Sequence, residues 1–292
     1  MVMKTLEWKG GRHAVLALHG LLSCPVEMQY VGRMLAKSGY AVRAPVIKGY
    51  SFATLGTTKV ATAEHWLAEV ENHFNDLKRH HDTVSVTGLC IGAVLAMKLA
   101  IRRGSDVAAL GLLAPVLAYD GWGLPRSKVL LPLAMHTPLR HVWKYKERFP
   151  YGLKNENMRR WIEAEMKAKT NSIAGAASLS GEGIYQAHRL IGKVKRQLRD
   201  LTVPTLIVHA LEDDVTSIKS ANLIESRISS SIQRKVLLHN SYHMVTLDND
   251  KDQVASETIA FFDQYAIHKN EAPEPVNNVL PLGGKPTLVQ VA

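Results

Sequence analysis

The chain of 292 residues contains only two cysteines, Cys24 and Cys90. Two cysteines are too few for the disulfide framework that stabilises small secreted proteins, and no Cys/His spacing resembles a zinc site. No apolar run approaches the roughly 20 residues of a membrane-spanning helix. The N-terminus also lacks the apolar stretch and cleavage site of a signal peptide. We therefore expect a cytoplasmic protein without a metal or an organic cofactor.

Acidic residues are in the minority, with 26 Asp and Glu against 36 Lys and Arg, and the net charge is +10. The excess is concentrated in residues 120–200, which hold 16 basic and seven acidic residues. This segment could face an acyl carrier protein, the phosphates of coenzyme A or an anionic membrane. It could equally be a solvated helical surface. No recognition motif accompanies the charge, so a nucleic-acid partner is not expected.

Strand and helix patterns alternate along most of the chain, which is long enough for one large domain or two small ones. Short apolar runs predict strands at residues 12–18, 40–45, 83–87, 107–113, 204–209 and 233–239. Helical patterns lie between and after them, at residues 26–37, 62–80, 94–103, 218–228 and 253–265. This alternation predicts an α/β fold with a mostly parallel sheet and helices on both faces.

The alternation breaks after the fourth predicted parallel strand and resumes near residue 204. We therefore predict a core from residues 1–117 and 202–270, with a helical, basic cap inserted between them at residues 118–201. Residues 271–292 are rich in Pro, Gly, Asn and Val and have no helical period. They predict a flexible C-terminal tail.

The most informative motif is Gly-Leu-Cys-Ile-Gly at residues 88–92, between a β-branched run and an Ala-rich helical run. A nucleophile between two glycines, at a strand-to-helix turn, is the pattern of a nucleophile elbow. The turn is too tight for ordinary flanking side chains, and its central residue adopts a strained conformation. Cys90 is thus the candidate nucleophile, and the helix behind it favours its anionic form.

A base and an acid follow in the chain order typical of such sites. His243 lies in the loop between the last predicted strand and the last helix, which suits a general base. Glu212, Asp213 and Asp214 follow the strand at residues 204–209, and one of them would orient the imidazole. The spacing favours Asp213, with Asp214 as the alternative.

Two backbone N–H groups are expected to bind the oxyanion. One belongs to Ile91, directly after the nucleophile, and the other to Leu21, directly after the His19-Gly20 pair at the end of the first apolar strand. The candidate substrate-binding residues are His19, Trp122 and Leu130. Leu130 belongs to an apolar stretch of the predicted cap that could line an acyl groove.

These motifs resemble those of the α/β-hydrolase superfamily, in particular small-cap bacterial carboxylesterases and monoacylglycerol lipases. The resemblance covers about residues 15–265 and includes the His19-Gly20 pair, the elbow, the stretch around Asp213 and residues 243–248. It implies an α/β-hydrolase fold, a Cys90–His243–Asp213 triad, oxyanion donors at Leu21 and Ile91, and cleavage of esters with short or medium acyl chains. The sequence departs from the family in two respects: cysteine replaces the usual serine, and the cap is long and basic.

Cysteine at the elbow is compatible with hydrolysis and widens the range of reactions. Its acyl-enzyme would be a thioester, which can pass the acyl group to water, an alcohol, an amine or a thiol. We therefore expect an esterase or thioesterase. An acyltransferase that uses the same intermediate, or a non-catalytic acyl-binding member of the fold, remains an alternative.

Overall fold

The computed structural model describes residues 4–266, apart from 56–58, 126–134, 136, 170, 173–174 and 177. Leu130 and the predicted tail at residues 271–292 lie outside the described residues. In the described part of the chain, no helix is long and apolar enough to cross a membrane.

A seven-stranded sheet forms the centre of the molecule, in the order β1-β3-β2-β4-β5-β10-β11. β1 pairs antiparallel with β3 at one edge, and the other neighbouring strands pair in parallel. The strand bounds are β1 Leu6–Trp8, β2 His13–Leu18, β3 Ala41–Ala44, β4 Thr83–Leu89, β5 Val107–Leu113, β10 Thr205–Ala210 and β11 Gln233–Leu238. This architecture confirms the predicted fold class.

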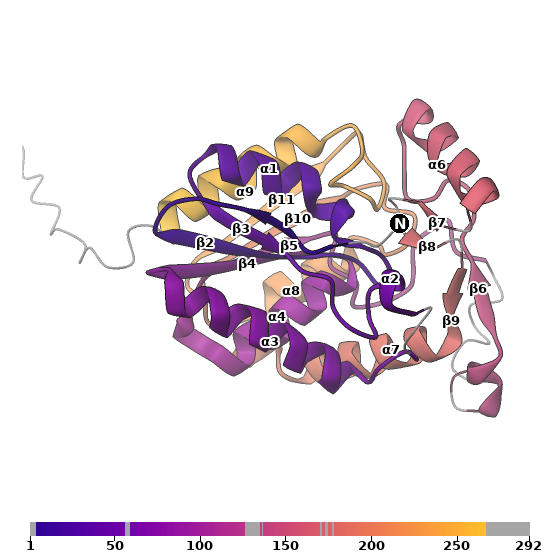
Figure 1. Ribbon diagram of the computed structural model, residues 1–292, viewed down its shortest axis with the longest axis horizontal. Coiled ribbons are helices and arrows are strands. Elements are labelled where there is room, and N and C mark those ends of the chain that lie inside the picture. The colour runs from indigo at the N-terminus through magenta and orange to yellow at the C-terminus, as the bar shows by residue number, and fades with distance from the viewer. Residues whose placement is uncertain are drawn as a thin grey trace, which may run out of the picture.

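The central strands are buried along their whole length, as expected for a parallel sheet that is covered on both faces. Helices α1 and α9 pack together on one face, and α3, α4 and α8 lie on the other (Figure 1). Their bounds are α1 Gln29–Lys37, α3 Ala63–His80, α4 Ile91–Arg103, α8 Lys219–Arg227 and α9 Lys251–Tyr265. The four-residue helix α2, Phe52–Leu55, lies in the loop between β3 and α3.

The chain leaves the sheet after β5, where the sequence predicted an inserted cap. In this region β6 (Lys144–Lys146) pairs antiparallel with β9 (Ser178–Ser180), and β7 (Asn171–Ser172) pairs with β8 (Gly175–Ala176). Helix α6, Glu156–Lys169, stands away from the sheet (Figure 1). We call residues 118–180 the cap segment.

The last α-helix before the chain returns to the sheet is α7, Gly181–Arg196, which packs against α3 and α4. Its buried side, which includes Ile184, Ala187, Leu190 and Ile191, joins the same apolar cluster as the inner faces of those helices. Helix α7, which falls within the predicted cap range of 118–201, therefore packs against the core.

Candidate active site

The strand-to-helix turn after β4 has the geometry of a nucleophile elbow. Cys90 has φ 59° and ψ −120°, a conformation that is strained for a residue with a side chain. A Cβ on Gly88 would lie 2.4 Å from the backbone of Gly92, and one on Gly92 would lie 2.4 Å from the carbonyl oxygen of Leu18. Only glycine fits at these two positions, so the two glycines let Cys90 stand at the carboxyl end of the central strand.

The predicted oxyanion donors are the backbone N–H groups of Leu21 and Ile91. Leu21 lines the same pocket as Cys90. Ile91 is the first residue of α4, so its N–H belongs to the first turn, where a helix leaves backbone donors without an intrahelical partner. The Gly20–Leu21 loop is held by Glu27, whose Oε2 accepts from the N–H of Gly20 at 2.7 Å.

His243 and Asp213 form a buried hydrogen-bonded pair, with 2.8 Å between His243 Nδ1 and Asp213 Oδ2. The other oxygen of Asp213 accepts from the N–H groups of Val215 and Thr216, both at 2.9 Å. Asp213 therefore fixes the tautomer in which His243 Nδ1 carries a proton. Nε2 of His243 is buried and has no hydrogen-bond partner in the described structure.

The electrostatic surroundings of His243 favour its charged form. Burial by itself lowers the pKa of His243, but the charges of Asp213 and Cys90 and the hydrogen bond to Asp213 outweigh it. The pKa of His243 is raised well above its ordinary value as a result. The site therefore favours the imidazolium form of His243.

The loop that carries His243 is anchored by two further carboxylates. Asp248 is fully buried and accepts from four backbone N–H groups, those of Lys154, Asn155, Tyr242 and Asn249. Asp214 accepts from the N–H of His243 at 3.3 Å and from that of Gly152 at 3.2 Å. Both carboxylates therefore join the cap segment to the histidine loop.

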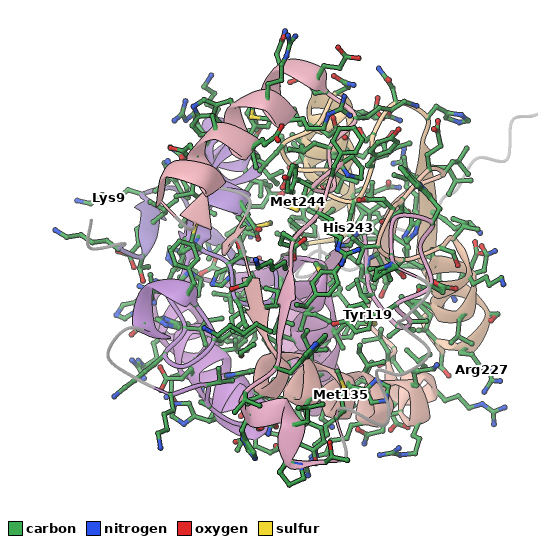
Figure 2. All side chains as sticks on the ribbon, turned by 90° about the vertical axis from the view of Figure 1, so that its right-hand side faces the viewer. Lys9, Tyr119, Met135, Arg227, His243 and Met244 are labelled. Atoms are coloured by element: carbon green, nitrogen blue, oxygen red, sulfur yellow. The ribbon has the colours of Figure 1, made fainter. Side chains whose placement is uncertain are left out.

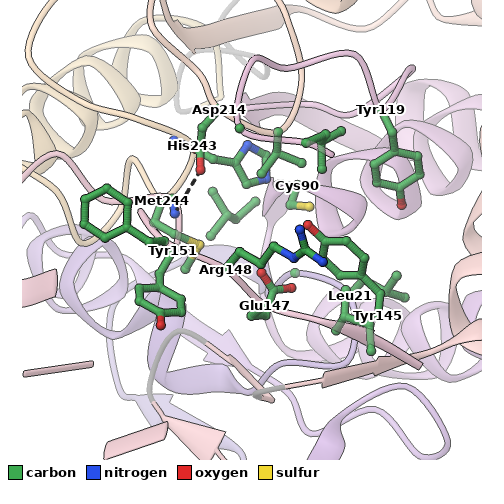
Figure 3. A pocket seen from close by; sticks show the side chains of 18 of the residues that line it. Leu21, Cys90, Tyr119, Tyr145, Glu147, Arg148, Tyr151, Asp214, His243 and Met244 are labelled. Carbon is green, nitrogen blue, oxygen red and sulfur yellow. Dashed lines mark hydrogen bonds between the residues drawn. The ribbon is translucent and has the colours of Figure 1, made fainter. Parts of the chain in front are cut away.

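A cavity of about 100 Å³ opens between these residues and the cap segment. Viewed from the cap side, His243, Met244 and Tyr119 lie near the middle of the molecule (Figure 2). Across the pocket from Cys90 and His243 lie Tyr145, Glu147 and Arg148 of the cap segment (Figure 3). The walls carry four aromatic residues, Tyr119, Tyr145, Phe149 and Tyr151, and three carboxylates outside the predicted triad, Glu27, Glu147 and Asp214.

The three carboxylates are held in surroundings that resist negative charge. Burial raises the pKa of Glu27 to about 7, although the N–H of Gly20 and the charge of His243 partly oppose it. Burial also raises the pKa of Glu147 to about 7, with the charge of Asp214 adding to the effect. The pKa of Asp214 is raised as well, chiefly by burial. Among the described residues, no group of His, Cys, Asp or Glu side chains is arranged to hold a metal ion.

Of the predicted substrate-binding residues that the structure describes, neither His19 nor Trp122 lines this cavity. His19 is fully buried and has its pKa lowered to about 4 by burial. Its Nδ1 donates to the carbonyl oxygen of Gly20, and its Nε2 accepts from the hydroxyl of Ser51, so it supports the loop before Leu21. Trp122 is 58% exposed, and its Nε1 donates to the carbonyl oxygen of Glu212.

Sequence reasoning missed the pocket residues Glu27, Glu147, Tyr119 and Tyr145, because a single glutamate or tyrosine carries no local motif. It also missed His209, a buried residue of β10 whose Nε2 donates to the carbonyl oxygen of Thr216. That bond steadies the loop whose N–H groups hold Asp213. The signal that could have found His209 is a polar side chain inside an otherwise apolar strand.

Comparison with known proteins matches residues 10–250 to the Hydrolase_4 family, described as serine aminopeptidase, S33. The chain is 29% identical over 266 residues to a thermostable monoacylglycerol lipase of Bacillus sp. (strain H-257), covering 88% of this chain and 93% of that protein. It is 24% identical over 265 residues to a carboxylesterase of Bacillus subtilis (strain 168), covering 89% and 96%.

Solved structures show the same fold. A structure from a study of the metagenome-derived lipolytic enzymes LipS and LipT superposes with a TM-score of 0.74 at 23% identity, covering 90% of this chain and 98% of the other. The monoacylglycerol lipase of Paleococcus ferrophilus superposes with a TM-score of 0.72 at 12% identity, covering 90% and 99%. The likeness extends over nearly the whole of each protein.

Proposed function

Because the chain belongs to the Hydrolase_4 family and is an α/β-hydrolase-fold enzyme of the esterase and lipase type, we propose that it cleaves acyl esters through a covalent intermediate on Cys90. The observation that carries this proposal is the hydrogen-bonded pair formed by His243 and Asp213. Nε2 of His243 has no partner in the described structure, and His243 lines the same pocket as Cys90. By the names of the relatives, candidate substrates are monoacylglycerols and other carboxylic esters. The small cavity suits a short or medium acyl chain or a thioester of one.

Each residue of the site then has a chemical role. The sulfur of Cys90, deprotonated by His243 Nε2, attacks the acyl carbonyl carbon, and the N–H groups of Leu21 and Ile91 hold the oxyanion. The protonated His243 gives its proton to the leaving oxygen or sulfur, and the thioester acyl-enzyme remains. His243 then takes a proton from the acceptor, which attacks the thioester and releases Cys90. Asp213 stabilises the imidazolium and fixes its orientation throughout.

Acyl transfer is the second candidate function, and the identity of the nucleophile favours it. A thioester lies higher in energy than the oxygen ester that serine would form, so it can pass its acyl group to an alcohol, amine or thiol. In this second candidate function, exposed basic side chains of the cap segment, such as Lys144 and Lys146, attract an acyl carrier protein, coenzyme A or an anionic membrane toward the pocket.

The test follows the leaving group and the intact protein mass with p-nitrophenyl esters and acyl-CoA thioesters of graded chain length. The variants are Cys90→Ala and Cys90→Ser, with Cys24→Ala as a control, because Cys24 is buried and burial raises its pKa to about 12. We expect an acyl adduct on the wild type and on Cys24→Ala, and neither adduct nor turnover with Cys90→Ala. Absence of adduct and turnover in the wild type at every chain length would instead indicate a non-catalytic acyl-binding protein.

A further inference from the structure

The pocket combines carboxyl side chains with aromatic walls in a chain whose net charge is +10. Outside the Asp213–His243 pair, its charged groups are the carboxylates of Glu27, Glu147 and Asp214 and the guanidinium of Arg148. Three carboxylates therefore face one cation. Aromatic faces beside carboxylates are the chemistry that recognises organic ammonium groups.

Two of these carboxylates are occupied by backbone hydrogen bonds, and the third is free, in the described structure, to bind a ligand. Glu27 accepts from Gly20, and both oxygens of Asp214 accept backbone N–H groups. Glu147 differs, because no described residue forms an ion pair or hydrogen bond with its carboxylate. Figure 3 shows it extending from the cap segment into the pocket, opposite Cys90 and His243.

Two further polar atoms on the pocket side have no partner in the described structure. The hydroxyl oxygen of Tyr119 and Nε2 of His243 are both buried and unbonded, and both residues line the cavity. Buried polar groups are normally satisfied, so unpartnered ones around a cavity indicate that a ligand completes them. The acyl group and Cys90 account for the histidine, but not for Glu147 or Tyr119.

We propose that this pocket binds an alkylammonium group on the leaving or accepting side of the acyl-enzyme, with Glu147 as its counter-ion. The proposal rests on the acyl-enzyme of the proposed function. A leaving alcohol departs from the place where an acceptor enters, so one ammonium site serves both an ester of an amino alcohol and an incoming amine. Burial, with the charges of Asp214 and Glu27 adding to it, raises the pKa of Glu147 to about 7, and a bound ammonium would favour its ionised form.

If the ammonium belongs to the acceptor, the second step is aminolysis of the thioester acyl-enzyme. The amine nitrogen forms a bond to the thioester carbonyl carbon, and the carbon–sulfur bond breaks to release Cys90 as a thiolate. The ammonium loses two protons: one goes to Glu147 before attack, and the other goes to His243 as the amide forms. His243 and Cys90 then stand again as imidazolium and thiolate.

A matched substrate pair tests the site. Butyrylcholine and 3,3-dimethylbutyl butyrate have nearly the same shape but differ by one positive charge. We expect the wild type to prefer butyrylcholine in kcat/KM by about tenfold at pH 8, chiefly through KM. Glu147→Gln should reduce that preference to below about twofold and spare the neutral ester, whereas Glu156→Gln, an exposed change in α6, should leave the preference intact. The preference should also fall from pH 8 to pH 6, as Glu147 becomes protonated.

A second arm identifies the source of the ammonium. With p-nitrophenyl butyrate as donor, butylamine and butanol compete as acceptors, and mass spectrometry measures the amide and the ester that form. A larger amide yield that falls in Glu147→Gln assigns the ammonium to the acceptor. Preference for butyrylcholine without amide formation assigns it to the leaving alcohol.

The outcomes separate this proposal from the proposed function. If the wild type hydrolyses both esters equally and forms no excess amide, the ammonium site is wrong and the acyl-enzyme stands. A preference that persists in Glu147→Gln overturns the role of Glu147. Failure of every ester, with no adduct on Cys90, overturns both. Thermal melting of each variant checks that it remains folded.

Discussion

The two walls of the pocket are built in opposite ways. The core wall, which carries Cys90, His243 and Asp214, is fixed by backbone geometry and by buried hydrogen bonds. In the cap wall, which carries Tyr145, Glu147, Arg148 and Phe149, no described residue bonds to the carboxylate of Glu147, and Phe149 is 65% exposed. The difference suggests that the reaction is set by the rigid wall and the choice of substrate by the other.

The largest expected effect comes from the hydrogen bond that orients the histidine. Asp213→Asn should lower kcat by about 10³-fold, because the amide does not stabilise the imidazolium and favours the wrong tautomer. Since Asp213 raises the pKa of His243, that pKa should fall in the variant, as measured by NMR titration of the imidazole. An unchanged pKa together with unchanged kcat would show that the core wall does not depend on this bond.

A loss of stability should follow from the buried carboxylate beneath the histidine loop. Asp248→Asn replaces one acceptor oxygen by an NH₂ group that faces backbone donors, and we expect it to cost on the order of 3 kcal/mol in the free energy of unfolding. Urea unfolding measures this cost. Asp106→Asn, at an exposed ion pair, is the matched control and should change stability by less than about 0.5 kcal/mol.

Glu27 provides a pH-dependent test of the core wall. Its carboxyl has a folded-state pKa raised to about 7, so the folded state holds this proton more tightly than the unfolded chain. Glu27 therefore lowers the stability as pH rises from about 4.5 through 7. Glu27→Gln keeps an oxygen to accept from Gly20 and should stabilise the protein by about 2 kcal/mol at pH 8, with little change at pH 5. Equal effects at both pH values would contradict the role of ionisation.

The smallest change in stability is expected for a substitution at an exposed position of the cap segment. Val142 is 74% exposed, and Val142→Ala should change the free energy of unfolding by less than about 0.5 kcal/mol. The same change at Val208, which is fully buried in β10, should cost about 2 kcal/mol because it leaves a cavity. Similar costs at the two positions would show that the cap segment is as tightly determined as the core.

Much of the fold could be predicted because the buried strands of a parallel sheet are apolar along their length, and each of the six predicted strands is present. The edge strand β1 was missed because three residues, Leu6–Trp8, are too few to show a period. The sequence started the helix after the elbow at residue 94, whereas α4 begins at Ile91, because the glycine at 92 obscures its first turn.

The parts of the candidate site that occur in a fixed order along the chain could be predicted from the sequence. The parts that are defined by distances between side chains could not. The elbow, His243 and the acidic stretch lie at the ends of strands, so their order suggested a triad. The sequence left Asp213 and Asp214 open as the acid, and distances separate them, because Asp213 accepts from the imidazole whereas Asp214 accepts from the N–H groups of Gly152 and His243. Glu147 lies far along the chain from Cys90 and meets it only through the path of the cap segment.

The strained turn at Cys90 has an evolutionary consequence. Its φ of 59° is imposed by the backbone and by the two flanking glycines, and it makes the same demand on serine as on cysteine. Codons for these two residues differ by a single base. A lineage can therefore exchange a serine for a cysteine at this turn in one mutational step without altering the fold. If Cys90 forms the proposed acyl-enzyme, natural selection then acts on the lifetime and reactivity of that intermediate.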